Sequence, residues 1–433
     1  MAEPAERKIP GRAIAAARLS GLLRLGPFLA VMGPGIITGI VDDDATGITG
    51  YAIAGGRFGY SLLWVLILTV VTLAVVQEMA ARMGAVTGKG LADLIRERFG
   101  VRTTAVAMLA LLIANVTTVV AEFAGIAGAS EIFGVSRYVA VPAAAALVFL
   151  VVVCGSYRRV EVVLLTVSLV FVSYVITGFM AKPDWGAVGG HLVVPTFHLT
   201  LPYLTILIGL IGTTITPWMQ FYLQSSVVDK GLGVREYTLV RLDVWVGSFL
   251  TNFIAFFIIV TTAATLFVHG KPADTVTDVA QTLRPLAGDF AARLFAIGLL
   301  NACLMAAAVL PLSTAYAVCE AFGWERSVNR PLREAPAFFG LFAALIAVGA
   351  AAVLIPGVPL LTLMFLPNVV AGILLPLILF LMLKLVNDRR IMGSWVNSPV
   401  QNVIAWLATG LLIALTGIYL VIAILEGVGM LTG

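Results

Sequence analysis

Charged residues are scarce in this chain, and their scarcity excludes most soluble folds. Asp, Glu, Lys and Arg make up 12% of the 433 residues, whereas 60% of the residues are hydrophobic and the mean hydropathy is +1.04. A soluble domain needs a more polar surface, so this composition predicts an all-α polytopic membrane protein in contact with the lipid bilayer. The net charge of +4 mostly reflects basic residues in loops, and no nucleic-acid partner is expected.

Cysteine and histidine are also rare, with three residues of each. Cys154, Cys303 and Cys319 are widely spaced and lack the CxxC or Cys/His spacing of a zinc site, so we expect small core residues. The sequence contains no evident Ser/His, paired-aspartate or zinc-ligand constellation of an enzyme. We therefore expect neither catalytic residues nor a cofactor.

The chain begins with a basic segment that lacks the apolar core and cleavage site of a signal peptide. We expect residues 1–26 to remain attached as a cytoplasmic tail. Eleven apolar segments follow, at residues 27–56, 60–86, 103–128, 138–155, 160–181, 200–228, 238–268, 287–321, 335–356, 358–386 and 400–425.

The distribution of basic residues supports this number of spans and sets the orientation. With a cytoplasmic N-terminus, all but six of the 27 Lys and Arg residues fall on the cytoplasmic side, as the positive-inside rule requires. The six exceptions are Arg57, Arg137, Lys182, Lys271, Arg284 and Arg293. We expect a multi-pass protein of the cell inner (plasma) membrane with an extracellular C-terminus.

Three consecutive carboxylates, Asp42, Asp43 and Asp44, interrupt the first apolar segment. A charge within the membrane costs roughly 2.5–3.5 kcal/mol on insertion scales, so three together require compensation, most simply by a bound cation. Pro34 and five glycines within residues 33–50 weaken the helix here, and the carbonyls freed by a break must face a cavity or a ligand. The stretch predicts an ion site in a discontinuous helix. A solvated loop between two short spans is the alternative, but residues 27–54 are too few for two spans.

The sixth apolar segment contains a matching interruption. Pro217 removes a backbone donor and clashes with the preceding turn, so we expect unwinding near Thr213–Thr216. Five spans separate the starts of the two broken helices, as in transporters built from two inverted five-helix repeats. This spacing predicts a first repeat at residues 27–181, a second at 200–386 and an additional eleventh span at 400–425. Taken alone, the sixth segment could equally be a proline kink with threonines bonded to their own backbone.

These segments resemble the NRAMP family of divalent-metal transporters. The resemblance is carried by Gly33-Pro34-Gly35, Asp44, Phe58-Gly59-Tyr60, Ala121-Glu122-Phe123 and Phe221-Tyr222-Leu223-Gln224-Ser225-Ser226. Asp44 falls on the aspartate of the family's Asp-Pro-Gly-Asn motif, and Gly47 replaces its asparagine. The resemblance implies a LeuT-type fold with broken helices one and six. It also implies a metal site formed by Asp43, Asp44, Gly47, Thr213, Thr214, Thr216 and Gln220, with Asp42, Gln224 and Asn368 as additional candidates.

The departures from the family indicate a harder ion. The family's Met-Pro-His in span six is replaced by Thr216-Pro217-Trp218, so the soft thioether ligand is lost. Oxygen ligands suit Mg²⁺, Ca²⁺ and Mn²⁺, and a roomy acidic site suits Mg²⁺, which retains several waters. These changes resemble the NRAMP-related magnesium transporter branch. We expect a monomer that imports Mg²⁺, and also Mn²⁺, by alternating access.

Proton coupling is not expected, because the titratable groups of the classical family are missing. Trp218 and Gln224 occupy the positions of its span-six histidines, and residues 335–355 contain no charge. Glu122 remains as a candidate proton-path remnant, although a lone buried carboxylate more often bonds a neighbouring helix. The alternatives are a proton-coupled Mn²⁺/Fe²⁺ symporter and, less favoured, a cation channel, which would need several weak sites along a continuous path.

Overall fold

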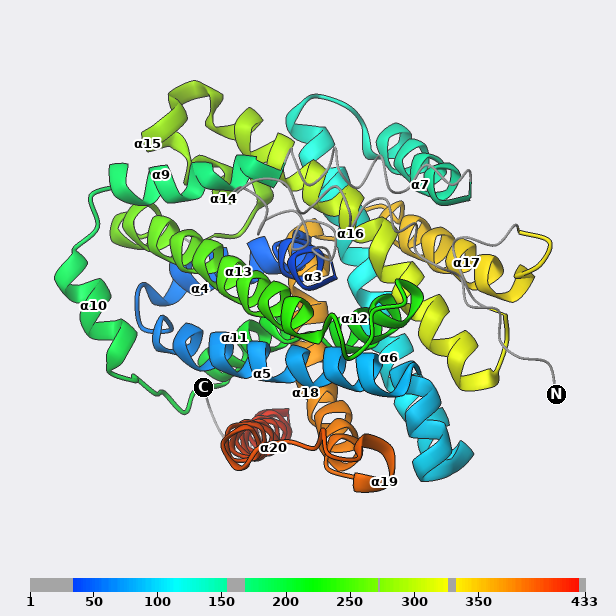
Figure 1. Ribbon diagram of the computed structural model, residues 1–433. Coiled ribbons are helices and arrows are strands. Elements are labelled where there is room, and N and C mark those ends of the chain that lie inside the picture. Colours follow the sequence, from blue (N-terminus) through cyan, green and yellow to red (C-terminus); the bar gives the residue numbers. More distant parts are fainter. Residues whose placement is uncertain (1–33, 154–167, 272, 326–331, 428–433) are drawn as a thin grey trace, which may run out of the picture.

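The computed structural model describes residues 34–153, 168–271, 273–325 and 332–427, and within these ranges every regular element is a helix (Figure 1). The elements of the expected spans are α3 (Pro34–Asp42), α4 (Ala45–Phe58), α5 (Trp64–Thr87), α6 (Leu91–Ile132), α7 (Arg137–Val153), η1 (Ser168–Phe171), α9 (Val172–Met180), α11 (Leu201–Thr214), α12 (Pro217–Asp229), α13 (Tyr237–Thr265), α16 (Ala291–Phe322), α17 (Pro336–Val353), α18 (Leu360–Val386) and α20 (Pro399–Gly427).

Eight helical stretches in the described part of the chain are long and apolar enough to cross a membrane. They include α11 and α12 taken together, whereas α3 and α4 are the two halves of the first expected span. The start of the expected fifth span and the N-terminal tail lie outside the described residues. The helical membrane class is therefore confirmed, and the limits of the two repeats stay predictions.

Several helices do not match the predicted segments. Short helices α10 (Trp185–Val193), α14 (Val276–Gln281), α15 (Arg284–Ala287) and α19 (Arg389–Met392) lie in connections where the sequence predicted no element. The third span begins twelve residues before its predicted start, because a polar helical segment precedes the apolar one. Gly100, with a φ of 79°, joins these two parts, a conformation that glycine adopts without steric cost.

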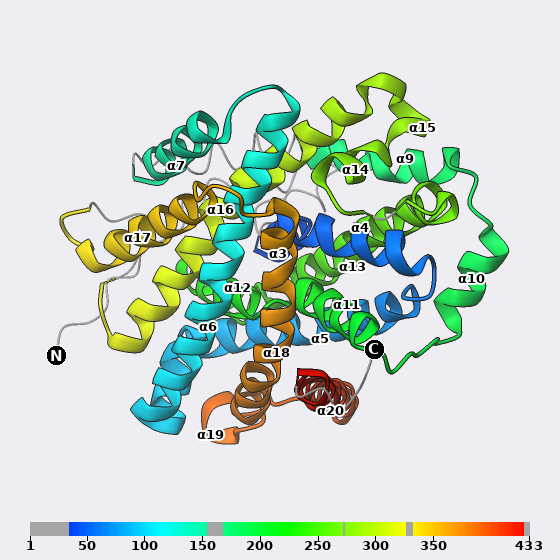
Figure 2. The same cartoon turned by 180° about the vertical axis from the view of Figure 1, so that it is seen from behind.

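Both broken helices lie in the middle of the molecule. In the two opposite views, α3 and α4 are enclosed by α13 on one side and α18 on the other (Figures 1 and 2). Helices α11 and α12 complete this central group, and the helix breaks expected from the sequence are present in both pairs. The core of the protein is therefore built around interrupted helices.

A buried ion pair in the C-terminal half of α5 connects this helix to α20 and to the segment that precedes α20. Glu78 and Arg82, both almost fully buried, lie 3.1 Å apart between Oε1 and Nε. The Arg82 guanidinium also donates to the Trp395 and Val396 carbonyls (2.8 and 3.0 Å), and Gln401 Nε2 donates to Glu78 Oε2 (2.8 Å). Because each charge has several partners, this cluster attaches α20 and the segment before it to α5.

We predict that Arg82→Ala lowers the free energy of unfolding by about 3–5 kcal/mol, because it leaves the Glu78 carboxylate buried without its counter-charge. The matched control is Lys89→Ala, which removes the half-exposed ion pair with Glu97 and should cost less than about 1 kcal/mol. Thermal unfolding of the detergent-solubilised variants measures both effects. Equal shifts in the two variants would contradict the predicted role of the cluster.

Candidate metal centre

The two helix breaks face each other. Asp43 and Asp44 separate α3 from α4, and Ile215 and Thr216 separate α11 from α12. Thr216 Oγ1 donates to Asp42 Oδ1 at 3.5 Å. The chain segments that carry the sequence-predicted ligands are therefore brought together by the fold.

The second break is shorter than the sequence indicated. Unwinding was expected from Thr213 to Thr216, but Thr213 and Thr214 still belong to α11. Thr216 adopts an extended conformation (φ −72°, ψ 141°), because a proline restricts the residue before it to this region. Thr213 and Thr214 therefore lie in the last turn of a helix and not in the unwound segment.

Asp44 caps the helix that follows it. Its Oδ1 accepts hydrogen bonds from the Thr46 N–H (2.7 Å), the Gly47 N–H (3.0 Å) and the Thr46 hydroxyl (2.7 Å). These bonds fix the orientation of the carboxylate at the amino-terminal end of α4 and leave Oδ2 outside the cap. Asp44 can thus serve as a structural cap and as a charged ligand with different oxygens.

Asp42 and Asp43 have different surroundings. Asp42 ends α3, and its Oδ2 accepts a hydrogen bond from the Thr251 hydroxyl of α13 at 3.3 Å. Asp43 Oδ1 is buried without a hydrogen-bond partner. All three aspartates are 2% exposed. An unpartnered oxygen on a buried carboxylate is costly, and a bound cation would relieve that cost.

Gly47 is required by the backbone geometry of the break. A Cβ atom at this position would lie 2.2 Å from the carbonyl oxygen of Asp42, which no side chain tolerates without a shift of the main chain. Gly47 itself offers only backbone atoms, and its N–H is already bonded to Asp44. Its role in this structure is to leave room for the Asp42 carbonyl at the C-terminal end of α3.

Neutral oxygens surround the carboxylates. The Thr213 hydroxyl lies 3.5 Å from that of Thr46, whereas the Thr214 hydroxyl donates to the Leu210 carbonyl and contacts the Tyr51 hydroxyl at 3.0 Å. The Thr214 hydroxyl is therefore already hydrogen-bonded within its own helix.

Gln220 lies one turn into α12 and is fully buried. Its amide nitrogen, oriented toward the break, donates to the Thr216 and Pro217 carbonyls (2.6 and 2.9 Å). Gln220 and Thr216 thus supply neutral oxygens directly at the second break.

The additional candidates separate into near and distant residues. Asn368 Nδ2 donates to the Thr46 carbonyl (2.8 Å), so α18 reaches the first break. Glu122 Oε2 accepts from the Ala45 N–H at 3.3 Å, and its Oε1 is buried without a hydrogen-bond partner. Gln224 lies about 12 Å along α12 from Thr216 and donates to the Lys89 carbonyl, so it does not join the carboxylates.

Two residues of the site were missed by the sequence reasoning. Thr251 of α13 touches Asp42, and Tyr51 of α4 touches Thr214. A hydroxyl next to Asn252 within an apolar span was the only available signal for Thr251, because nothing in the sequence says which helix packs beside the break. Tyr51 gave no signal beyond its position in the same segment as the aspartates.

The carboxylates do not converge on one point. No group of three His, Cys, Asp or Glu side chains in the described ranges is arranged as a ready-made metal site. Asp42 and Asp44 are directed to different hydrogen-bond donors, so a cation here would complete its shell with hydroxyl, carbonyl and amide oxygens or with water. The carboxyl ends of α3 and α11 also meet at the site, and helix C-termini favour positive charge.

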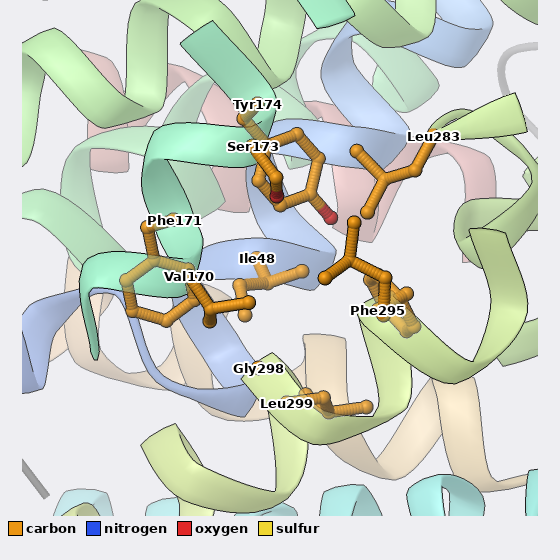
Figure 3. Close-up of a pocket in the computed structure, with 10 residues that line it drawn as sticks. Ile48, Val170, Phe171, Ser173, Tyr174, Leu283, Phe295, Gly298 and Leu299 are labelled. Atoms are coloured by element: carbon orange, nitrogen blue, oxygen red, sulfur yellow. The ribbon is translucent and has the colours of Figure 1, made fainter. Parts of the chain in front are cut away.

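The region next to α4 is closed in this conformation. A cavity of about 10 Å³ lies beside Ile48, one turn after Asp44, and is lined mainly by apolar side chains of η1 and α16, including Phe171, Phe295 and Leu299 (Figure 3). That volume accommodates about one water molecule and no hydrated cation. With the aspartates almost inaccessible, the candidate site is occluded here.

Comparison with known proteins agrees with this geometry. A family model described as natural resistance-associated macrophage protein-like (Nramp) matches residues 35–423. The divalent metal cation transporters MntH of Ralstonia nicotianae and Bacillus subtilis are 29% and 28% identical to this chain, over 98% and 92% of it and over 99% and 92% of their own lengths.

Solved structures show the same fold. The manganese transporter of Eremococcus coleocola, crystallised with an aromatic bis-isothiourea substituted compound, has a TM-score of 0.71 at 20% identity and covers 91% of this chain and 86% of its own. Mhp1, a nucleobase-cation-symport-1 family transporter, has a TM-score of 0.52 at 17% identity and covers 90% and 93%. The expected LeuT-type fold is confirmed.

We predict that Gly47→Ala weakens Mn²⁺ binding by roughly tenfold or more, because its Cβ must displace the Asp42 carbonyl. Gly56→Ala is the matched control on the same helix, about 18 Å along α4 from Asp44. Its Cβ would come no closer than 3.2 Å to another residue, at the Ala273 Cβ, so we expect a loss of roughly threefold or less. Calorimetric titration of both variants with Mn²⁺ measures the difference, and similar losses would contradict the steric argument.

Proposed function

Because this chain belongs to the Nramp family of divalent-metal transporters, we propose that it imports Mg²⁺, and accepts Mn²⁺, by alternating access without a coupled proton. The observation that carries this proposal is the oxygen-only set of groups around the two breaks. Asp42, Asp43 and Asp44 supply carboxylates, and Thr216 and Gln220 supply neutral oxygens.

The absence of a soft ligand at the second break supports a hard cation. Thr216-Pro217-Trp218 brings no thioether to the unwound segment, and the nearby Met219 sulfur instead accepts a hydrogen bond from Gln77 Nε2 at 3.7 Å. Carboxylate, hydroxyl and amide oxygens do not discriminate strongly between Mg²⁺ and Mn²⁺. Mn²⁺ is therefore expected to remain a substrate.

The driving force does not require a proton. An inside-negative potential supplies about 4.6 kcal/mol per 100 mV for a divalent cation, twice the value for a single charge. His191, His198 and His269 are all at least partly exposed and lie outside the central helices, and α17 contains no charged residue. These features support uptake down the electrochemical gradient.

Proton-coupled symport is the second candidate, and Glu122 is the observation that favours it. Its carboxylate bonds the backbone at the start of α4 and keeps one oxygen without a hydrogen-bond partner. A proton carrier would need such a position beside the substrate. A structural tie between α6 and α4 explains the same contact without proton movement.

We predict that charge dominates binding at this site. Asp44→Asn keeps a residue that caps α4 well but removes the charge, so saturable Mn²⁺ uptake should be lost. Thr216→Val should raise the KM by roughly tenfold or less, since a water molecule can replace a neutral oxygen. Uptake into proteoliposomes across a range of Mn²⁺ concentrations tests this order. If Asp44→Asn lost no more activity than Thr216→Val, the electrostatic ranking would be wrong.

We predict that uptake does not acidify the vesicle interior. Proteoliposomes carrying a pH-sensitive dye should take up Mn²⁺ at neutral pH without a stoichiometric proton signal, and Mg²⁺ should inhibit at concentrations comparable to those of Mn²⁺. Glu122→Gln is the matched variant, because it keeps the size of the side chain. Metal-dependent acidification that disappears in Glu122→Gln, together with no inhibition by excess Mg²⁺, would assign the protein to proton-coupled symport.

A further inference from the structure

The amino-terminal end of α3 is bound by a carboxylate of another helix. Asp243 of α13 is fully buried, and its Oδ2 accepts a hydrogen bond from the Gly35 N–H at 2.6 Å. Its Oδ1 accepts a longer one from the Ile36 N–H at 3.4 Å. A negative charge at a helix N-terminus satisfies free N–H groups and interacts favourably with the helix dipole.

The same face of α13 holds the rest of α3. Asp243, Gly247 and Thr251 follow at intervals of four residues and therefore lie along one face of the helix. A Cβ atom on Gly247 would lie 2.2 Å from the Gly35 carbonyl oxygen, and one on Gly39, in the middle of α3, would lie 2.6 Å from the Gly247 carbonyl oxygen, so the two backbones are in direct contact. Thr251 then bonds Asp42 at the carboxyl end of α3.

We propose that this face of α13, defined by Asp243, Gly247 and Thr251, is the surface that holds the half-helix α3 in place, here called its seat. Asp243 is the positioning residue that keeps α3 in contact with this surface. The three contacts run from the first turn of α3 to its last residue, which carries a carboxylate of the candidate site. Movement of α3 away from this seat would displace Asp42 at the same time.

This inference rests on the proposed alternating-access function. With a cytoplasmic N-terminus, α3 is the half of the first span that is expected to lie on the cytoplasmic side of the candidate site. Release of the ion to that side requires α3 to separate from its neighbours. Hydrogen bonds from a charged acceptor and backbone-to-backbone packing both oppose separation. Asp243 therefore biases the protein toward the closed conformation described here without touching the substrate.

A cysteine probe on α3 tests the seat directly. Thr38 is fully buried and bonds Gln77 of α5, so Thr38→Cys, with Cys154, Cys303 and Cys319 replaced by alanine, reports the opening of α3. In metal-free proteoliposomes, Asp243→Asn should raise the rate of labelling by N-ethylmaleimide by up to about fivefold, because it keeps an acceptor for the Gly35 N–H but loses the favourable interaction of the negative charge with the helix dipole. Asp243→Glu should return the rate toward that of the parent, because it keeps the charge.

A second variant makes the test independent of the charge. Gly247→Ala must push α3 off α13 and should also raise labelling of the Thr38→Cys probe. The matched control is Asp184→Asn, since Asp184 caps α10 through the Gly186 and Ala187 N–H groups and should leave the rate unchanged. A probe within α13, Thr261→Cys, should remain protected in every variant.

The proposal is overturned if neither Asp243→Asn nor Gly247→Ala increases labelling at position 38, or if labelling rises equally at position 261. The KM for Mn²⁺ should rise in Asp243→Asn while the unfolding temperature changes little, a combination that a purely structural role would not produce. Labelling involves no transported ion, so its outcome is separate from whether the substrate is Mg²⁺.

Discussion

Buried negative charge at the meeting point of two broken helices is the constraint on which the rest of this structure depends. Asp42, Asp43 and Asp44 are almost inaccessible, and none of the neighbouring groups described at the site carries a positive charge. The free-energy cost of burying these carboxylates is reduced by hydrogen bonds from hydroxyl and backbone N–H groups, although Asp43 keeps one oxygen without a hydrogen bond. A divalent cation bound at this point, as the proposed function requires, would complete the core.

Close backbone contact makes this arrangement possible. Gly47 admits the Asp42 carbonyl, and Gly247 admits the backbone of α3, so segments that would be separated by side chains lie in direct contact. In a membrane, where burial of apolar surface does not drive helix association, such contacts and buried hydrogen bonds supply much of the packing energy. The glycines of the first segment thus serve the packing of the helix halves as well as the break itself.

The three aspartates have distinct structural positions despite being consecutive. Asp44 is fixed by the helix that it caps, and Asp42 by the hydroxyls of Thr216 at the second break and Thr251 of α13, whereas Asp43 keeps its Oδ1 without a hydrogen bond. A cation could therefore draw on carboxylates with different freedom to move. The chain has the fold of the Nramp family. The oxygen ligands and non-titratable residues at its second break are the basis for our proposal that it carries a harder cation without a coupled proton.

The sequence by itself determined the membrane class, both helix breaks and the residues beside them, because scarce charge, proline and clustered aspartates have strong local consequences within a bilayer. It could not identify Thr251 or Asp243 as partners of α3, or separate Gln224 from the site, since these depend on which faces of distant helices meet. The exact unwound residues were also misjudged by two positions, because Thr213 and Thr214 kept helical hydrogen bonds that Pro217 does not disturb. The break in a helix depends on neighbouring residues in the sequence, whereas contacts between distant helices depend on how the whole chain packs.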